Sequence, residues 1–133
     1  MLETLQVKTH AREQLIDLSA EVRAVLSRSG VRDGLVVVFS THTTAAITIN
    51  ENADPDVPRD MLHWLSQKIP QHWEFVHGEG NADAHLKTSL FGVSQTVIVH
   101  QGRLMLGRWQ GIFLAEFDGP RTREVLVKVV ASA

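Results

Sequence analysis

The stretch Leu35-Val-Val-Val-Phe39 decides the fold class of this chain. It is too short for a helix and is dominated by β-branched residues, so it predicts a buried strand. The next apolar segment runs from Ala45 to Asn50 and alternates through Ile47 and Ile49, which predicts a second strand. We therefore expect a core built on β-structure.

Similar patterns extend this expectation toward both ends of the chain. Strands are predicted at Leu2 to Lys8, Thr96 to His100, Ile112 to Phe117 and Arg123 to Val130. In the last of these strands one face carries Val125, Val127 and Val129, and the other face carries Leu126. Turn residues follow two of the strands, at Gln101-Gly102 and Asp118-Gly119-Pro120.

Two segments carry helical signals. Ser19 can cap a helix that runs to about Ser29, and Gly30 supplies its C-terminal cap. A second helix is expected from Asp54-Pro55, with Asp at the N-cap and Pro at the first helical position, until Pro70 stops it. Its apolar residues form one stripe: Val57, Met61, Leu62, Leu65 and Ile69. About six strands and two or three helices, without strict β-α-β alternation, predict an α+β fold with a mostly antiparallel sheet.

Length and composition limit the class of protein. A chain of 133 residues predicts a single domain over residues 1–133, and its net charge of −2 argues against a nucleic-acid partner. No apolar run reaches the length of a membrane span, and the N-terminus lacks the features of a signal peptide, so we expect no membrane association and a cytoplasmic location. The absence of cysteine excludes disulfides, thiolate ligands and a cysteine nucleophile.

A metal site is the first functional hypothesis. Two imidazoles and two carboxylates lie within His77-Gly-Glu-Gly-Asn-Ala-Asp-Ala-His85, which is too glycine-rich to predict a regular helix. His42 follows the strand at Leu35 to Phe39, and three histidines would leave an open metal position of the catalytic type. The alternative is that these are solvated loop residues, because the chain has seven histidines and some will fall near carboxylates by chance.

Three blocks of the sequence carry a resemblance to a known family. The blocks read His42-Thr-Thr-Ala-Ala-Ile-Thr-Ile-Asn-Glu51-Asn-Ala-Asp54-Pro, then Glu79-Gly-Asn-Ala-Asp83-Ala-His85-Leu-Lys-Thr-Ser89, then Gly107-Arg-Trp109-Gln110-Gly111-Ile. In this order they resemble the YjbQ-like family of small bacterial and archaeal proteins, which are described as secondary thiamine-phosphate synthases. The family's Gly-Thr-Trp-Gln reads Gly107-Arg108-Trp109-Gln110 here, which adds a positive charge.

The resemblance implies a fold, an assembly and a reaction. It implies an α+β, sandwich-like domain and a homotrimer with sites between its subunits. It also implies a histidine-rich metal site with a divalent ion, zinc or magnesium, and a weak ability to make thiamine phosphate. That reaction joins hydroxymethylpyrimidine diphosphate to a thiazole phosphate with loss of pyrophosphate, so the partners are small phosphorylated metabolites.

The chemistry of that reaction gives the block residues their expected roles. Departing pyrophosphate carries negative charge, which a metal ion and basic groups would stabilise. The expected catalytic residues are His42, Glu51 and His85. The expected metal ligands are His42, His77 and His85, and the carboxylates expected behind them are Asp83 and Asp54. The expected substrate contacts are Lys87, Ser89, Arg108, Trp109 and Gln110.

Simpler interpretations stand beside these roles. The simpler role for Lys87 and Arg108 is that of solvated surface charges. The simpler role for Trp109 is that of a core residue, and for Gln110 that of an ordinary strand residue. Asp54 has a sufficient task as a helix cap. Two other functions also remain open: a metal-dependent hydrolase of a phosphorylated metabolite in which Glu51 acts as base, and a non-catalytic protein that binds a metabolite or a metal. A nucleotide-binding loop is not supported, because the chain has no Walker motif.

Overall fold

The computed structural model describes residues 1–133 and contains eight strands and three helices. In chain order these are β1 (Leu2–Lys8), β2 (Gln14–Asp17), α1 (Ser19–Ser29), β3 (Gly34–Ser40), β4 (Ala45–Glu51), α2 (Asp56–Lys68), α3 (Ala82–Phe91), β5 (Ser94–His100), β6 (Arg103–Leu104), β7 (Gln110–Glu116) and β8 (Thr122–Ala131).

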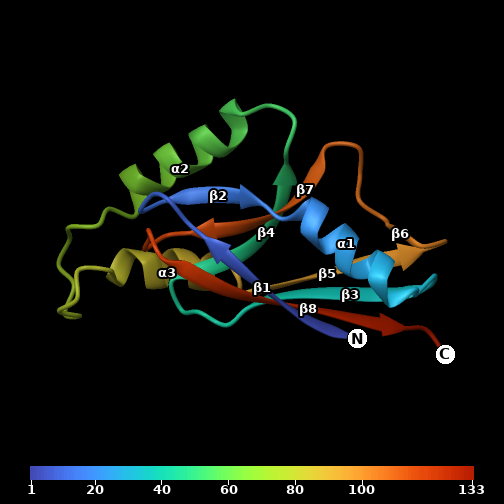
Figure 1. Cartoon of the computed structure of the whole chain (residues 1–133). Helices are drawn as coiled ribbons and strands as arrows, with labels where there is room; N and C mark the ends of the chain where they lie inside the picture. The colour runs from blue at the N-terminus through green and yellow to red at the C-terminus, as the bar shows by residue number, and fades with distance from the viewer.

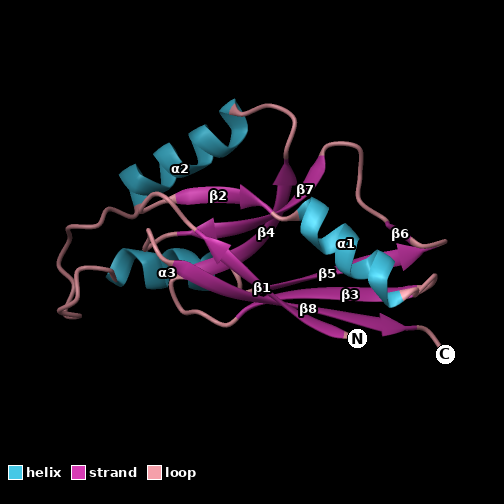
Figure 2. Cartoon of the chain, in the orientation of Figure 1, coloured by secondary structure: helices cyan, strands magenta, loops and turns pink.

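The strands form two antiparallel sheets. The larger sheet has five strands in the order β1-β8-β3-β5-β6, and the smaller has three in the order β2-β7-β4. Figure 1 shows the smaller sheet and α1 on one side of the larger sheet, with α2 beyond the smaller sheet and α3 at the left end of the molecule, next to β4. Figure 2 shows the same layers by secondary structure. The predicted α+β class with mostly antiparallel pairing is confirmed.

The main core lies between the two sheets and α1. Val36 and Val38 of β3 are fully buried there, as predicted for the stretch Leu35 to Phe39. The inward valines of β8 pack into the same cluster, and they are Val125, Val127 and Val129. Helix α1 adds Val22, Val25 and Leu26 to this cluster, so it covers the part of the larger sheet that the smaller sheet leaves open. Buried and exposed residues therefore alternate along the strands of the larger sheet because only one face of that sheet is covered.

A second cluster buries the other face of the smaller sheet. Ala46 of β4 and Ala115 of β7 pack there against Leu65 of α2 and Ala84 of α3. Phe117 closes this cluster, and its ring meets that of Phe91 edge-on at a centroid distance of 5.3 Å. Because β7 lies between β2 and β4 and is covered on both faces, it is buried from Gly111 to Glu116, whereas β4 is fully buried only from Ala45 to Ile47.

Helix α3 is the main element that the sequence interpretation missed. The region from His77 to His85 was expected to be irregular, but the helix starts at Ala82 and carries His85 on its second turn. The two glycines that argued against a helix, Gly78 and Gly80, lie before its start. Strand β2 was also missed, because only four residues pair with β7.

The helix starts differ by small shifts from those predicted. Leu18, not Ser19, precedes α1; the Asp17 carboxylate accepts a hydrogen bond from the Ser19 amide at 2.8 Å, and the Ser19 hydroxyl accepts one from the Ile112 amide. The predicted end of α1 is confirmed, because Gly30 is left-handed with φ 68°. Helix α2 begins at Asp56, and its expected stripe is half-buried apart from the buried Leu65.

The outer face of the larger sheet carries an exposed row of apolar side chains. Leu35 lies between Ile98 and Val130 in the register, and these side chains are 42%, 62% and 44% exposed. Phe39 lies further along β3 on the same face and is also exposed. No helix covers this side of the sheet in Figure 1. No helix of the chain has the length and apolar character needed to cross a membrane.

Candidate functional site

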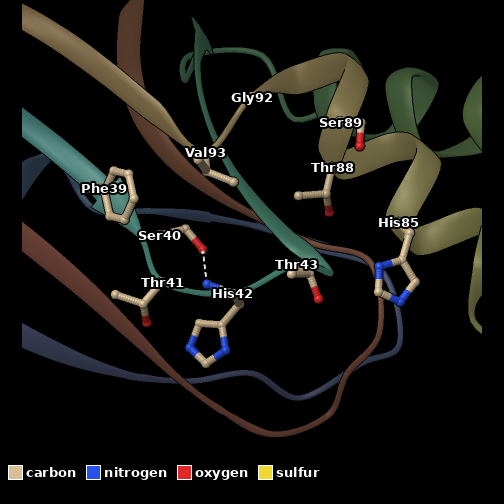
Figure 3. A pocket seen from close by; sticks show the side chains of 10 residues that line it. All are labelled: Phe39, Ser40, Thr41, His42, Thr43, His85, Thr88, Ser89, Gly92 and Val93. Carbon is tan, nitrogen blue, oxygen red and sulfur yellow. Dashed lines mark hydrogen bonds between the residues drawn. The ribbon is translucent and has the colours of Figure 1, made fainter.

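The largest cavity lies between the connection from β3 to β4 and the second half of α3. It has a volume of about 610 Å³ and combines imidazoles with hydroxyl groups. Figure 3 shows the side chains that line it: Phe39, Ser40, Thr41, His42, Thr43, His85, Thr88, Ser89, Gly92 and Val93. The predicted residues His42, His85 and Ser89 therefore share one cavity, which is of the size that small metabolites occupy.

The backbone around His42 is held by Ser40. The Ser40 hydroxyl donates to the Ala45 carbonyl at 2.8 Å and accepts from the His42 amide at 3.2 Å, as Figure 3 shows for the second bond. This hydroxyl sits at the end of the buried β3 and closes the tight connection to β4. Its one donor is thus used within the chain, and the buried hydroxyl serves to place His42.

The ring of His42 is also fixed. Its Nε2 accepts a hydrogen bond from the backbone amide of Glu124 at 2.8 Å, so the proton of the neutral ring is on Nδ1. Partial burial, and then the positive charge of Arg123, lower the pKa of His42 below its ordinary value of 6.5. His42 is therefore a neutral imidazole with one N–H to donate.

A buried ion pair lies beneath this connection. The Arg123 guanidinium donates to both carboxylate oxygens of Glu116 and to the Thr44 hydroxyl at 2.9 Å, and both charged side chains are almost inaccessible. Burial alone would raise the pKa of Glu116, but hydrogen bonds from Arg123, the Asp118 amide and Thr9 outweigh it and lower that pKa. The pair ties β7 and β8 to the loop that presents His42.

A second cavity adjoins the first along α3. It has a volume of about 430 Å³ and is mainly apolar, with a lining of Phe75, Val76, His77, Ala82, His85, Leu86 and Ser89. Both cavities share His85 and Ser89. The first cavity is thus rich in hydroxyl groups and the second is apolar, and the two meet at the imidazole of His85.

Three hydroxyl groups of the larger cavity are available to a ligand. Thr43 and Ser89 are exposed at its wall, and neither hydroxyl has a protein partner. The Thr88 hydroxyl is buried and makes no hydrogen bond within the chain. Because a buried hydroxyl without a partner costs about 1–3 kcal/mol, Thr88 is suited to bind a polar ligand group that would satisfy it.

The predicted three-histidine metal set does not form within one chain. The rings of His77 and His85 lie edge to face with centroids 5.4 Å apart, and Glu79 is 3.8 Å from His77 Nε2. His42 does not join them, because its Nε2 is bonded to the Glu124 amide. No group of three histidine, aspartate or glutamate side chains is placed to hold a metal ion. The expected ligands thus do not come together within one chain, and the metal site stays a prediction.

The predicted roles of Lys87 and Asp83 are also corrected. Both side chains are buried, and Lys87 Nζ binds Asp83 at 2.8 Å and Glu13 at 3.2 Å. Asp83 also accepts two hydrogen bonds from Arg12, at 2.9 and 3.1 Å. Burial opposes ionisation of Asp83, but Arg12 and Lys87 outweigh it and lower its pKa. Lys87 therefore fastens α3 to the segment before β2, and no phosphate can reach it; Asp83 holds no imidazole.

Glu51 and Asp54 lie away from the cavity. Glu51 is the last residue of β4, which starts at Ala45 beside His42. Seven residues of strand span about 20 Å, so Glu51 and the imidazoles lie at opposite ends of β4. The Asp54 carboxylate accepts the Asp56 amide at 2.9 Å at the start of α2, as a helix cap does. The expected set of His42, Glu51 and His85 is not assembled in one chain.

The third sequence block, from Gly107 to Ile112, lies at the end of β4 that carries Glu51. Trp109 is 53% exposed, which excludes a core role, and the Arg108 guanidinium stacks over its ring at 4.6 Å. Gln110 pairs with Glu51 in the sheet, and its Oε1 accepts the Gly107 amide at 2.7 Å. Arg108 and Trp109 are therefore free to bind another molecule, whereas the Gln110 carbonyl is used to close its own loop.

Sequence interpretation overlooked the buried Glu116–Arg123 pair. A signal was present: Arg123 is in phase with Val125, Val127 and Val129 on the inward face of β8. A charged residue at an inward position requires a buried partner of opposite charge. The partner itself lies seven residues earlier on β7, across the turn at Asp118-Gly119-Pro120.

Comparisons with known proteins agree with this picture of the fold. A family model described as UPF0047 protein YjbQ-like matches residues 3–132. The chain is 54% identical to UPF0047 protein MJ1081 of Methanocaldococcus jannaschii, over 98% of this chain and 94% of that protein. It is 52% identical to UPF0047 protein YugU of Bacillus subtilis, over 98% and 99%.

Solved structures of similar sequence have the same fold. A YjbQ/UPF0047 protein of Clostridium acetobutylicum superposes with a TM-score of 0.95 at 51% identity, covering 96% of this chain and 99% of that one. A YbjQ-like protein of unknown function from Sulfolobus solfataricus gives a TM-score of 0.95 at 30% identity, covering 99% and 97%.

Proposed function

The chain belongs to the YjbQ-like UPF0047 family, and from this premise we propose a secondary thiamine-phosphate synthase-like enzyme whose sites lie between copies of the chain in a homotrimer. The substrates are hydroxymethylpyrimidine diphosphate and a thiazole phosphate. The thiazole nitrogen forms a bond to the methylene carbon of the pyrimidine, and the bond from that carbon to the diphosphate oxygen breaks. The electron pair of the broken bond leaves with pyrophosphate.

The observation that carries the proposal is the pair of adjoining cavities. A joining reaction needs two substrates side by side with their reacting atoms in contact. The cavities of about 610 and 430 Å³ share His85 and Ser89, so ligands in the two would meet at these side chains. The hydroxyl-rich cavity suits the diphosphate, and the apolar cavity suits a flat ring such as the thiazole.

The hydroxyl groups and His42 would act on the leaving group. Thr43, Thr88 and Ser89 would donate hydrogen bonds to the diphosphate oxygens. His42 would donate its Nδ1–H, since Nε2 is held by the Glu124 amide. Donors that are fixed before the reaction stabilise charge as it develops, with little reorganisation. His85 stands where both substrates meet and would orient the diphosphate relative to the incoming nitrogen.

One chain supplies only half of this site. Departing pyrophosphate requires positive charge, but Lys87 is buried in its own ion pairs and Arg123 is neutralised by Glu116. Arg108 is a free guanidinium, yet it lies with Trp109 and Glu51 at the far end of β4. We propose that this end of one copy closes the His42–His85 cavity of the next copy, where Trp109 would cover the pyrimidine ring.

The outer face of the larger sheet supports such an assembly. Leu35, Ile98 and Val130 form an exposed apolar row across three strands. Burying apolar surface of this kind stabilises association, and exposed patches of it are typical of interfaces. A homotrimer would bury this face and bring opposite ends of different copies together. Native mass spectrometry is expected to give a trimer, and a monomer near 14.8 kDa would reject this assembly.

A divalent metal remains a separate prediction. Within one chain only His77 and His85 stand close together, so no step above is assigned to a metal ion. Metal analysis of protein purified without an affinity tag tests the expected zinc or magnesium. Activity that survives chelation would remove the metal from the account and leave the hydrogen-bonding scheme intact.

Direct assay tests the proposed reaction. Wild-type protein is expected to form thiamine phosphate slowly from the two substrates, and His85→Ala protein prepared in the same way is the blank. This blank controls for a contaminating host synthase. Equal rates from the two proteins would reject the enzyme and favour a protein that binds a phosphorylated metabolite. Metal-dependent hydrolysis of a phosphorylated metabolite, without thiamine phosphate, would favour the hydrolase.

A further inference from the structure

Three arginines gather around a separate cavity at the other end of β5. This cavity lies between α1 and the turn from β5 to β6 and has a volume of about 370 Å³. It is lined by Arg23, Leu26, Ser27, Gly102, Arg103 and Leu104. The Arg32 guanidinium lies against the same turn, since a side chain at Gly102 would meet Arg32 Nη1 at 3.0 Å.

None of these three arginines has a carboxylate partner. The salt bridges of the chain engage other cations, among them Arg28, which binds Glu3 through two hydrogen bonds of 2.9 and 2.7 Å. Asp33 follows Arg32 in sequence but contacts His100 Nδ1 at 2.9 Å instead. Arginine stays charged at all physiological pH values, so Arg23, Arg32 and Arg103 give this part of the surface positive charge that no carboxylate of the chain pairs with. A bound anion would pair with these charges.

The turn is built so that the Arg32 side chain lies against Gly102, the residue before Arg103. Gln101 and Gly102 both have positive φ, 52° and 76°, and the Gly102 amide donates to the Arg32 carbonyl at 2.8 Å. A residue larger than glycine at 102 would be strained and would push the guanidinium away. The backbone therefore places the segments that carry Arg32 and Arg103 side by side, although they are about 70 residues apart in the sequence.

We propose that this cavity is a binding site for a phosphate group on a small molecule. The guanidiniums of Arg23 and Arg103 would bind the phosphate oxygens, with Arg32 adding charge from behind the turn. The Ser27 hydroxyl would donate to the same group, and Leu26 and Leu104 would contact the apolar body of the ligand. Clustered positive charge at a concave surface also concentrates anions from solution. This site is separate from the His42–His85 cavity and does not rest on the function proposed for it.

Amide NMR titration of the full chain tests this site. Inorganic phosphate and pyrophosphate are the phosphate probes, succinate is the carboxylate probe, and Arg103→Gln and Arg23→Gln are the variants. Arg59→Gln is the matched control, because Arg59 is an exposed arginine on α2 whose nearest carboxylate is 3.7 Å away. Pyrophosphate is expected to shift the amides of Ser27, Gly102 and Leu104. Each cavity variant should weaken pyrophosphate binding by at least about tenfold, because it removes a charge-assisted hydrogen bond to the ligand.

Three results would overturn the proposal. The first is unchanged pyrophosphate affinity in both Arg103→Gln and Arg23→Gln. The second is a set of shifts centred on the His42–His85 cavity rather than on this one. The third is succinate binding as tightly as pyrophosphate, which would make the site a general anion surface. All variants change exposed side chains, so loss of folding does not confuse the result; their amide spectra should match the wild type in the absence of ligand.

Discussion

The backbone amide of Glu124 donates a hydrogen bond to Nε2 of His42 across 2.8 Å, joining β8 to the connection between β3 and β4. This bond fixes the tautomer of the ring and turns a predicted metal ligand into a neutral donor. We expect ¹⁵N NMR at pH 7 to show His42 protonated on Nδ1 alone. Protonation on Nε2, or a metal-induced shift of His42 nitrogen signals, would contradict this assignment.

The burial of His42 and its nearness to the Arg123 charge make stability depend on pH. The pKa of His42 is lower in the folded chain than its ordinary value of 6.5, so below that pH the unfolded state binds more protons. The free energy of unfolding should therefore fall as pH drops from about 7 toward 5. His42→Gln should reduce this slope relative to the wild type in urea unfolding at pH 5, 6 and 7. Parallel slopes for the two proteins would show that His42 is not responsible.

Removing one member of the buried Glu116–Arg123 pair should strongly destabilise the chain. Arg123→Met leaves the Glu116 carboxylate buried without its partner, which typically costs about 3–5 kcal/mol. The double variant Glu116→Gln/Arg123→Met should recover part of this loss. Urea unfolding measures both effects. If the two substitutions were independent, their losses of unfolding free energy would simply add in the double variant. Such additivity would exclude the expected coupling between Glu116 and Arg123.

Lys87→Met separates the structural role of this lysine from its predicted phosphate role. After the substitution Asp83 keeps only Arg12 as its cationic partner, and Glu13 loses its contact with the buried Lys87. The free energy of unfolding should therefore fall by about 2–4 kcal/mol. The KM values for both substrates should change little in protein that remains folded, because Lys87 is inaccessible. A large rise in KM with unchanged stability would restore the phosphate-binding role.

Thr88→Val tests whether a ligand satisfies the unpaired hydroxyl. Because the Thr88 hydroxyl has no partner in the chain, replacing it with a methyl of the same shape should leave stability unchanged or raise it. Affinity for the pyrimidine diphosphate should fall at the same time. Thr44→Val is the matched control, since the Thr44 hydroxyl accepts from Arg123 and its loss should destabilise the chain. A stability loss in Thr88→Val as large as in the control would show that Thr88 is structurally satisfied.

Local patterns predicted the sheet and two helices because they depend on neighbouring residues. The alternation in β8 and the cap at Gly30 are signals of this kind. Helix α3 was missed because glycines before Ala82 dominated the interpretation of that segment, although Asp83 and Lys87 stand at helical spacing on one face.

The candidate site depends on contacts that spacing does not encode. His42 and Glu124 are 82 residues apart, so the bond that fixes the ring could not be predicted from the sequence. The separation of His42 from Glu51 could have been predicted from the sequence. Both residues flank one predicted strand, and a strand of that length separates its ends by about 20 Å. The length of β4 keeps His42 and Glu51 apart within one chain, and the sites between subunits that the resemblance implies remain a prediction.

The composite site predicts that inactive variants complement each other. His85→Ala damages the cavity half, and Glu51→Ala damages the half that the next copy would supply. Each protein alone should be inactive. In a 1:1 mixture of cyclic trimers assembled at random, about a quarter of all sites would combine two intact halves. His85→Ala mixed with His42→Ala is the control, because both changes fall in the same half and no site would be restored.

Thiamine phosphate formation by these mixtures, refolded together and assayed beside the wild type, is the most direct measurement. We predict about a quarter of the wild-type rate for the His85→Ala and Glu51→Ala mixture, and no activity above either variant alone for the control mixture. Wild-type activity without any recovery in the first mixture would contradict a site shared between copies, because intact halves from two chains would then have met without restoring the reaction.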